Sequence, residues 1–157
     1  DKKIEKNVKV LHFKYFEDLL KLMKNEISSR KYDVIIHSAA VSDYAPFFLE
    51  GKIKSGKKNL IIKLKPTIKI IDQIKKWDPR CFLVKFKLEV GLEEKKLVDV
   101  AYKSMLDSNA DLIVANDFKN VSGEHKAFVI DKDKNVISCS GKNEIVKKLF
   151  LEIKNKI

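Results

Sequence analysis

The sequence lacks the glycine-rich motifs that mark many phosphate-binding and catalytic turns. Its 157 residues include five glycines, and none of these belongs to a GxGxxG, GxxxxGK[ST] or GxSxG pattern. The three histidines, His12, His37 and His125, form no HExxH or HxxH group, and Cys81 and Cys139 form no CxxC pair. These absences exclude the usual signatures of P-loop, serine hydrolase and zinc proteins. We therefore predict no metal-ligating residues.

Long apolar runs and arginines are also scarce. No run reaches the roughly 18 residues of a membrane span, and the first residues contain no signal-peptide core. Arginine occurs only as Arg30 and Arg80 among 33 basic residues. Because DNA readers use arginine for bidentate base contacts, we expect no nucleic-acid partner. We predict a cytoplasmic protein that does not bind membranes and keeps its two cysteines as buried thiols.

Lysine dominates the charge of the chain, and the net charge is +11. One explanation is a general lysine bias of the surface that involves no partner. The other is a positive field that gathers a small polyanionic ligand. The composition leaves both open.

Hydrophobic periodicity predicts that strands and helices alternate along the chain. We expect strands over 8–13, 33–41, 59–65, 81–89 and 111–117, a hairpin over 127–140, and helices over 16–27, 66–77, 93–108 and 143–153. The stretch 33–41 has the pattern of a central strand buried on both faces. This order predicts a Rossmann-like, three-layer α/β fold, with a mainly parallel sheet, helices on both faces and a C-terminal antiparallel hairpin. At this length we expect a single domain over 1–157.

The segment from Asp33 to Lys54 holds the main candidate ligand site, because open α/β sheets bind ligands where strands end. Ser38, Ala39 and Ala40 follow the strand, and their small side chains would let a ligand approach the backbone or let helices pack. Asp43 could accept hydrogen bonds from a base, a ribose or an amine, or it could cap a turn. The residues alone leave these alternatives open.

Other candidates lie further along the chain. Lys52 belongs to a basic loop, predicted to be a mobile lid, and could meet a phosphate or remain a solvated lysine. The predicted helix that starts at Pro66 could hold an anion on its free amides. Phe86 could stack on a base or belong to the core. Taken alone, these residues indicate a nucleotide-binding or phosphoester-binding domain.

Five short motifs occur in one order and make the interpretation more specific. They are SAAVSDY at 38–44, GKIKS at 51–55, LKPTIKIID at 64–72, FKLE at 86–89, and ADLIVAND at 110–117 followed by EHKA at 124–127. Together they resemble the phosphopantothenate–cysteine ligase (phosphopantothenoylcysteine synthetase) family of coenzyme A biosynthesis.

The resemblance implies a ligase that joins 4'-phosphopantothenate and L-cysteine through an acyl-nucleotide intermediate, with release of pyrophosphate and a nucleoside monophosphate. It favours CTP over ATP as the nucleoside triphosphate, with Mg²⁺ on the phosphates. It also implies a homodimer, and a fusion to or an association with a flavin-dependent decarboxylase.

The resemblance assigns roles to individual residues. Ser38, Ala39 and Ala40 match the segment that lines the nucleotide pocket, and Asp43 matches the nucleotide-contacting aspartate. Lys52 matches the lysine of the flexible loop that acts at the phosphates, and we predict it to be catalytic. Nucleotide contacts are also implied for a further set: Pro66, Thr67, Ile68 and Lys69 around the triphosphate, Phe86 beside the base, and Lys103.

Two family features have no match in this sequence. A glycine turn and an asparagine-containing segment, which the family has near its N-terminus, have no counterpart before Val8. Two helix lysines of the bacterial fused branch correspond to Ser104 and Ser108, with Lys103 as the nearest substitute. We therefore interpret the chain as the C-terminal part of the domain and, if it were complete, would expect weak or no activity alone. The alternative is a non-catalytic nucleotide-binding fragment or regulatory subunit.

Overall fold

The computed structural model describes residues 8–48, 50–53, 55–56, 58–117 and 126–157. Its main sheet has five strands in the order β1-β4-β5-β6-β7. The strands β1, β4 and β5 run parallel, and β6 and β7 pair antiparallel to complete the sheet. Their bounds are Val34–His37 for β1, Phe82–Glu89 for β4, Leu112–Asp117 for β5, Lys126–Asp131 for β6 and Val136–Ser140 for β7.

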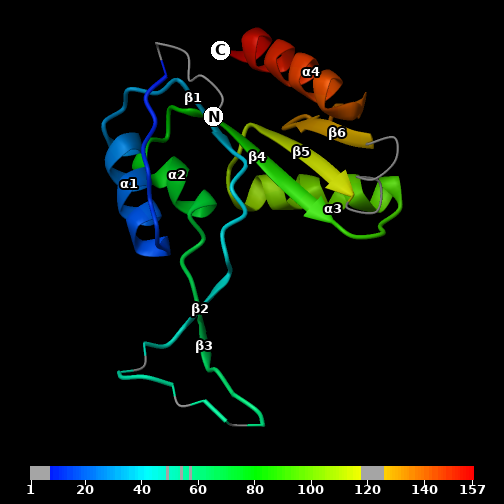
Figure 1. Cartoon of the computed structure of the whole chain (residues 1–157). Coiled ribbons are helices and arrows are strands. Elements are labelled where there is room, and N and C mark those ends of the chain that lie inside the picture. Colours follow the sequence, from blue (N-terminus) through cyan, green and yellow to red (C-terminus); the bar gives the residue numbers. More distant parts are fainter. Residues whose placement is uncertain (1–7, 49, 54, 57, 118–125) are drawn as a thin grey trace.

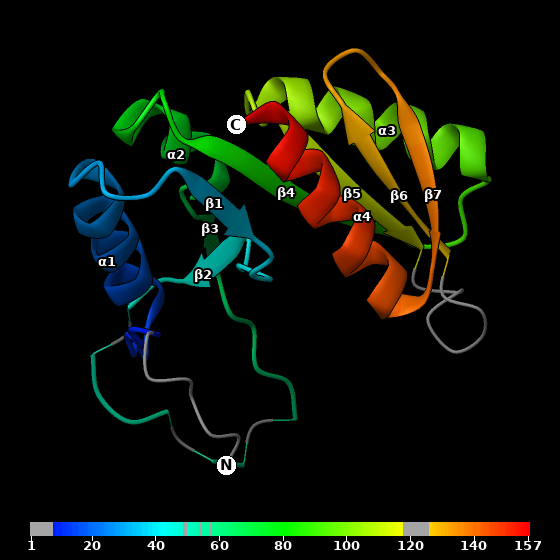
Figure 2. The same cartoon turned by 90° about the horizontal axis from the view of Figure 1, so that it is seen from above.

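Helices cover both faces of this sheet (Figure 1). One face packs against α1 (Phe16–Ser28), α2 (Ile71–Trp77) and α3 (Glu94–Asp107). The other face packs against α4 (Gly141–Lys156), which lies across the sheet from α3 in Figure 2. The arrangement confirms the predicted α/β fold with three layers and a C-terminal antiparallel hairpin.

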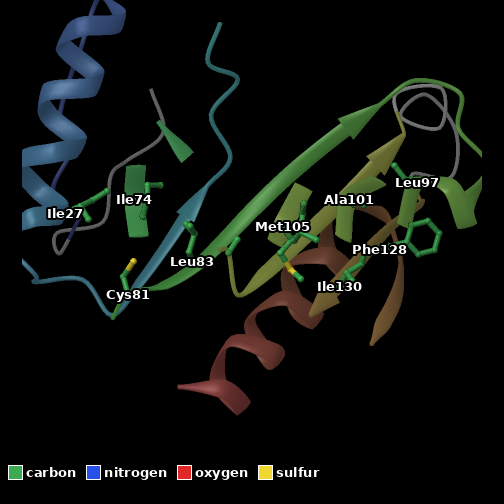
Figure 3. Close-up of a cluster of buried hydrophobic side chains, with 12 residues drawn as sticks. Ile27, Ile74, Cys81, Leu83, Leu97, Ala101, Met105, Phe128 and Ile130 are labelled. Atoms are coloured by element: carbon green, nitrogen blue, oxygen red, sulfur yellow. The ribbon is translucent and has the colours of Figure 1, made fainter. Parts of the chain in front are cut away.

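Side-chain alternation along β4 and β5 explains the three layers. Successive residues of a strand point to opposite faces, so Leu83 and Ile113 pack towards α1, α2 and α3, while Val84 and Val114 pack towards α4. Figure 3 shows the first of these two clusters. The helix α3 places Leu97, Ala101 and Met105 on one face at intervals of four residues, and all three are buried.

Asp111 joins four elements at the amino ends of β4 and β5. Its Oδ2 accepts a hydrogen bond from the Leu83 amide at 2.7 Å and lies 2.6 Å from Lys75 Nζ on α2. Its Oδ1 lies 2.6 Å from Nζ of Lys132, which follows β6. Burial raises the pKa of the Asp111 carboxyl, but the hydrogen bonds from Lys132, Lys75 and Leu83 outweigh burial and keep it below the ordinary value.

A two-stranded arm projects from the body at the other end of the sheet (Figure 1). It consists of β2 (Tyr44–Pro46), β3 (Leu64–Pro66) and the described residues between them, and the two strands pair antiparallel and form a separate sheet. At its base, the Thr67 amide donates to the Asp43 carbonyl at 2.9 Å, and Thr67 Oγ1 donates to the Ser42 carbonyl at 2.6 Å. These two hydrogen bonds hold the start and the end of the arm together.

Two strand predictions near the N-terminus are wrong. Residues 8–13 form no strand, and Val8 and Phe13 are more than half exposed, because none of the described residues pairs with this segment. The predicted central strand over 33–41 ends at His37 and lies at the edge of the sheet, where Ile36 is 40% exposed. An apolar run alone does not distinguish an edge strand from a central one.

The prediction for 59–77 is also wrong in part. Only Leu64–Pro66 is a strand, and Ile61 is 89% exposed. The helix begins at Ile71 rather than at Pro66, because the Thr67 amide and hydroxyl bond across the arm and keep this segment out of the helix. Ile68, in the part of this range that is not helical, is 52% exposed.

The remaining elements agree with prediction to within a few residues at their ends. Both cysteines are buried and free, as expected. Glu124 and His125, the first two residues of the EHKA motif, lie outside the described residues. None of the described helices is long and apolar enough to cross a membrane.

We predict that Asp111→Ala lowers the free energy of unfolding by about 3 kcal/mol, because it leaves the Leu83 amide and two ammonium groups without their acceptor. Urea denaturation monitored by circular dichroism measures this loss. Asp133→Ala, at an exposed turn carboxylate nearby, is the control and should change stability by less than about 0.5 kcal/mol. Equal losses in the two variants would contradict the assigned role of Asp111.

Candidate functional site

A cavity of about 820 Å³ opens at the carboxyl ends of β1 and β4. This volume lies within the range of small-molecule sites, and its position is where parallel sheets bind their ligands. Its wall consists of residues 37–43, 67–72 and 85–88, with Ser104 and Asp107 of α3, Asn116 of β5, and Lys142, Ile145, Val146 and Leu149 of α4.

The cavity exists because β1 is shorter than β4. Pairing between the two strands stops at His37 and Lys85, whereas β4 continues to Glu89 and pairs there with β5 alone. The chain leaves β1 through Ser38, Ala39 and Ala40, whose small side chains do not fill the space beside the free edge of β4. Both faces of β4 therefore contribute to one cavity, with Phe86 on the α4 side and Lys85 on the α3 side.

Most of the predicted site residues line this cavity. They are Ser38, Ala39, Ala40, Asp43, Thr67, Ile68, Lys69 and Phe86. Three others do not: Pro66 is the last residue of β3, Lys52 is exposed on the arm, and Lys103 is exposed on α3. The ligand contacts of all these residues remain predictions.

Asp43 presents a free carboxylate to the cavity. Its main-chain carbonyl accepts from Thr67, but no hydrogen bond or ion pair engages its side chain among the residues that the structure describes. A turn-capping aspartate would use its carboxylate on a neighbouring amide. The side chain is thus available to a ligand, which favours the binding interpretation over the capping one.

Sequence reasoning missed Lys85 as a cavity residue. Its Nζ donates to the Ser104 carbonyl at 2.8 Å and to Ser108 Oγ at 3.1 Å. Burial lowers the pKa of this ammonium; Lys87 and Lys69 lower it further, while Asp72 and Asp107 act in the opposite direction. The sequence signal that could have revealed Lys85 is its position two residues after the apolar Leu83, which places both side chains on the same face of β4.

The α4 side of the wall was missed as well. Ile145 and Leu149 have the spacing of an ordinary core stripe, and both do contact the core. Their position beside Phe86 depends on how α4 crosses the sheet, which periodicity does not specify. The helix therefore serves the core and the cavity at once.

His37 lines the cavity and lies opposite Lys85 in the strand register. Burial lowers the pKa of its imidazole, and the positive charge of Lys85 lowers it further. The neutral form is therefore favoured at physiological pH. A neutral ring can donate one hydrogen bond and accept another.

The described residues contain no group of three or more His, Cys, Asp or Glu side chains arranged to hold a metal ion. Asp43, Asp72 and Asp107 each line the cavity. Magnesium needs only one or two carboxylates when nucleotide phosphates supply its other ligands. These carboxylates could contribute ligands to a cation that arrives with a phosphate compound.

These features define the class of the protein: a Rossmann-like domain with a ligand cavity at the carboxyl ends of its parallel strands. The family follows from comparison with known proteins. Residues 1–157 match the DNA/pantothenate metabolism flavoprotein C-terminal domain, and the chain belongs to this family. The match confirms the family that the five sequence motifs indicate.

Two curated relatives are bifunctional proteins of coenzyme A biosynthesis named CoaBC. The protein from Thermococcus kodakarensis is 41% identical over 73% of this chain and 28% of its own length. The protein from Methanocaldococcus jannaschii is 31% identical over 80% of this chain and 32% of its own length. The aligned part of the chain thus spans about a third or less of these relatives.

Solved structures have the same fold. The DNA/pantothenate metabolism flavoprotein from Streptococcus pneumoniae has a TM-score of 0.88 and 32% identity, over 99% of this chain and 76% of its own. A Cab2 mutant in complex with phosphopantothenate-cysteine has a TM-score of 0.68 and 20% identity, over 84% of this chain and 46% of its own. The second likeness supports the fold alone.

We predict that acidification destabilises the protein through His37. The folded pKa lies below the ordinary value of 6.5, so the unfolded chain binds more protons between these two values. Stability is therefore complete above about pH 6.5 and falls with decreasing pH, by at most about 1.4 kcal/mol per pH unit, until the folded pKa is reached.

Urea denaturation at a series of pH values from 7.5 to 4.5 tests this prediction, in steps of about half a unit. His37→Gln should remove this part of the pH dependence. His12→Gln, at an exposed histidine outside the cavity, should keep it. An unchanged pH profile in His37→Gln would refute the prediction.

Proposed function

We propose that this chain forms the phosphopantothenate–cysteine ligase domain of coenzyme A biosynthesis. The observation that carries the proposal is the cavity at the ends of β1 and β4, which is lined by eight of the residues that the family resemblance assigns to the nucleotide: Ser38, Ala39, Ala40, Asp43, Thr67, Ile68, Lys69 and Phe86. Family membership and the two CoaBC relatives of coenzyme A biosynthesis support it.

The proposed reaction has two steps. A carboxylate oxygen of 4'-phosphopantothenate attacks the α-phosphorus of the nucleoside triphosphate, and the bond from this phosphorus to the pyrophosphate oxygen breaks. The cysteine amine then attacks the acyl carbon of the mixed anhydride. The bond to the nucleoside monophosphate breaks, the amide forms, and the nitrogen loses a proton. The first step is required because a carboxylate is a poor acylating agent.

The wall of the cavity suits the two ends of a nucleotide. Phe86 on the α4 side offers an aromatic face to a base. The free carboxylate of Asp43 can accept a hydrogen bond from a ribose hydroxyl or a base amine. Lys69 offers donors and a positive charge for the phosphates. We propose CTP rather than ATP as the nucleotide, on the family resemblance.

Mg²⁺ is proposed to enter with the nucleotide. When bound, it neutralises phosphate charge that would repel the attacking carboxylate. Asp43, Asp72 and Asp107 are the carboxylates of the cavity wall that could complete its ligand shell. The lysines of the chain supply the remaining positive charge.

Lys52 is the proposed catalytic lysine. It is exposed on the arm and does not line the cavity, so the proposal requires the arm to carry its ammonium towards the phosphates. The hydrogen bonds of Thr67 fix only the base of the arm. Movement beyond that point would let Lys52 stabilise the charge that leaves with pyrophosphate, and would shield the anhydride from water.

The arm is also the proposed dimer contact. It contains a two-stranded sheet. The exposed apolar side chains of the arm include those of Tyr44, Phe47, Phe48, Ile61 and Leu64. Isolated two-stranded sheets are marginally stable, and apolar patches of this kind mark interfaces. A second copy of the chain would cover both strands. Fusion to a decarboxylase partner, suggested by the bifunctional relatives, remains part of the proposal.

We predict that Lys52→Met reduces phosphopantothenate-dependent pyrophosphate release from CTP by on the order of 100-fold. A coupled pyrophosphate assay on the full-length protein measures it, with ATP run in parallel. Lys58→Met, an exposed lysine of the same arm, is the control and should retain activity. Unchanged turnover in Lys52→Met would remove this residue from the mechanism.

The same assay decides between the proposed ligase and its alternative. Calorimetric binding of CTP without any pyrophosphate release would favour a non-catalytic nucleotide-binding fragment or regulatory subunit. A third outcome, DNA binding that weakens steeply with salt, would favour a lysine-rich nucleic-acid protein. Either result would overturn the ligase proposal.

We predict that the protein is a dimer and that the double variant Phe48→Asp, Ile61→Asp is a monomer, because each charge falls on an apolar side chain that is 89% exposed. Sedimentation equilibrium measures the mass of both proteins. Phe150→Asp, which alters an apolar residue on α4 that is 58% exposed, is the control and should leave the dimer intact. A monomeric parent, or a dimeric double variant, would contradict this arm contact.

A further inference from the structure

Lys85 places a partly buried positive charge in the cavity wall without a carboxylate partner. Its Nζ donates to two neutral acceptors, the Ser104 carbonyl and Ser108 Oγ. In the part of the chain that the structure describes, Lys85 forms no ion pair and no other hydrogen bond. A lysine ammonium has three donors, so one N–H is left for a ligand.

The hydrogen bonds to the last turn of α3 give a lysine at this position one structural role, but they leave its charge without an ion pair. The residue two places earlier on the same face is Leu83, which is completely buried in the core beside α3. Asp72 and Asp107 offset part of its charge without forming an ion pair with it. A partly buried ammonium at such a place costs stability, whereas an apolar side chain of similar length would pack without that cost. Its neighbour Lys87 differs, because it has an ion pair with Glu89 at 2.9 Å.

We propose that Lys85 binds the phosphate-bearing part of the ligand that occupies this cavity. The two hydrogen bonds to α3 fix the direction of its ammonium, and Lys69 and Lys87 line the same cavity and add positive potential. With Lys142, the lysines of the wall outnumber its three carboxylates, Asp43, Asp72 and Asp107, so the wall favours an anionic ligand.

The two faces of β4 indicate how such a ligand would lie. Phe86 belongs to the α4 side and Lys85 to the α3 side, and the free edge of β4 separates them. A ligand bound across this edge would place an apolar or aromatic part against Phe86 and an anionic part against Lys85. The shape thus suits a molecule with a ring or a chain at one end and phosphate at the other.

The identity of this phosphate rests on the proposed function, which offers two sources. One is the triphosphate of the nucleotide, and the other is the phosphate of 4'-phosphopantothenate. Both present the same chemistry to an ammonium. Separate titrations with each compound distinguish them.

The test is isothermal titration calorimetry of the full-length protein and of Lys85→Met. The titrants are CTP, 4'-phosphopantothenate, inorganic pyrophosphate and cytidine, which has no phosphate. We expect Kd to rise about tenfold or more in Lys85→Met for at least one of the first three titrants, and to stay unchanged for cytidine. Equal weakening for cytidine, or no weakening for any phosphate compound, would overturn the inference.

Thermal stability separates binding from a purely structural role. If Lys85 serves mainly to bind phosphate, the unliganded Lys85→Met protein should melt at the same temperature as the parent or at a higher one. A lower Tm would mean that the hydrogen bonds to Ser104 and Ser108 hold α3 in place, and would overturn the inference. Lys96→Met, an exposed lysine of α3 outside the cavity, is the control for both measurements.

A second variant restores the charge from another point of the wall. Ser104→Lys, combined with Lys85→Met, should recover part of the lost phosphate affinity because Ser104 lines the same cavity. Failure of this rescue, together with loss of cytidine binding, would indicate a misfolded site and would count against the inference.

The outcomes also separate this inference from the ligase proposal. Phosphate affinity that depends on Lys85, without any pyrophosphate release from CTP, would refute the ligase and keep the binding role. Normal pyrophosphate release with unchanged Kd values in Lys85→Met would refute the binding role and keep the ligase.

Discussion

The anchoring of Asp111 at the amino ends of β4 and β5 is the constraint on which the rest of the structure depends. One carboxylate accepts the Leu83 amide and pairs with Lys75 of α2 and with Lys132 beyond β6. It therefore fixes the spacing of two parallel strands, a helix and the antiparallel hairpin at one end of the sheet. Because these ends are closed by charge and hydrogen bonds, the space for a ligand lies at the opposite end. The cavity occupies that end.

The polar groups at the two ends of the sheet have opposite character. At the amino ends, the charge of Asp111 is balanced by two lysines. At the carboxyl ends, Asp43 and Lys85 have no ion-pair partner within the described residues, and each faces the cavity. These two charges without an ion pair mark the carboxyl ends as the side of the sheet that is organised for binding. Burial lowers the pKa values of His37 and Lys85 for the same structural reason, since both residues lie where β1 stops short of β4.

Sequence patterns correctly predicted the strands and helices whose apolar faces are covered by other elements of the chain. The pattern of 81–89, the continuous apolar run in 111–117 and the four-residue spacing of Leu97, Ala101 and Met105 correspond to β4, β5 and α3 as found. The same reasoning failed for 8–13 and 33–41, because an apolar run does not reveal whether a neighbouring strand exists to cover it. Cavity residues that follow a strand directly, such as Ser38 and Asp43, were predictable from their position. Lys85 and the α4 wall were not, since strand length and helix crossing decide which side chains reach the cavity.

The arm gives the clearest case of tertiary contacts overriding local sequence preference. Pro66 and Thr67 have the composition of a helix start, yet Thr67 gives its amide and hydroxyl to the opposite side of the arm, and the helix begins only at Ile71. The described residues between β2 and β3 consequently extend from the body with their apolar side chains exposed, and Lys52 is one of them. In the proposed ligase dimer, the arm provides both the subunit contact and the catalytic lysine. Docking of the arm on a second copy would then restrict the positions that Lys52 can occupy, so that association and turnover would depend on the same surface.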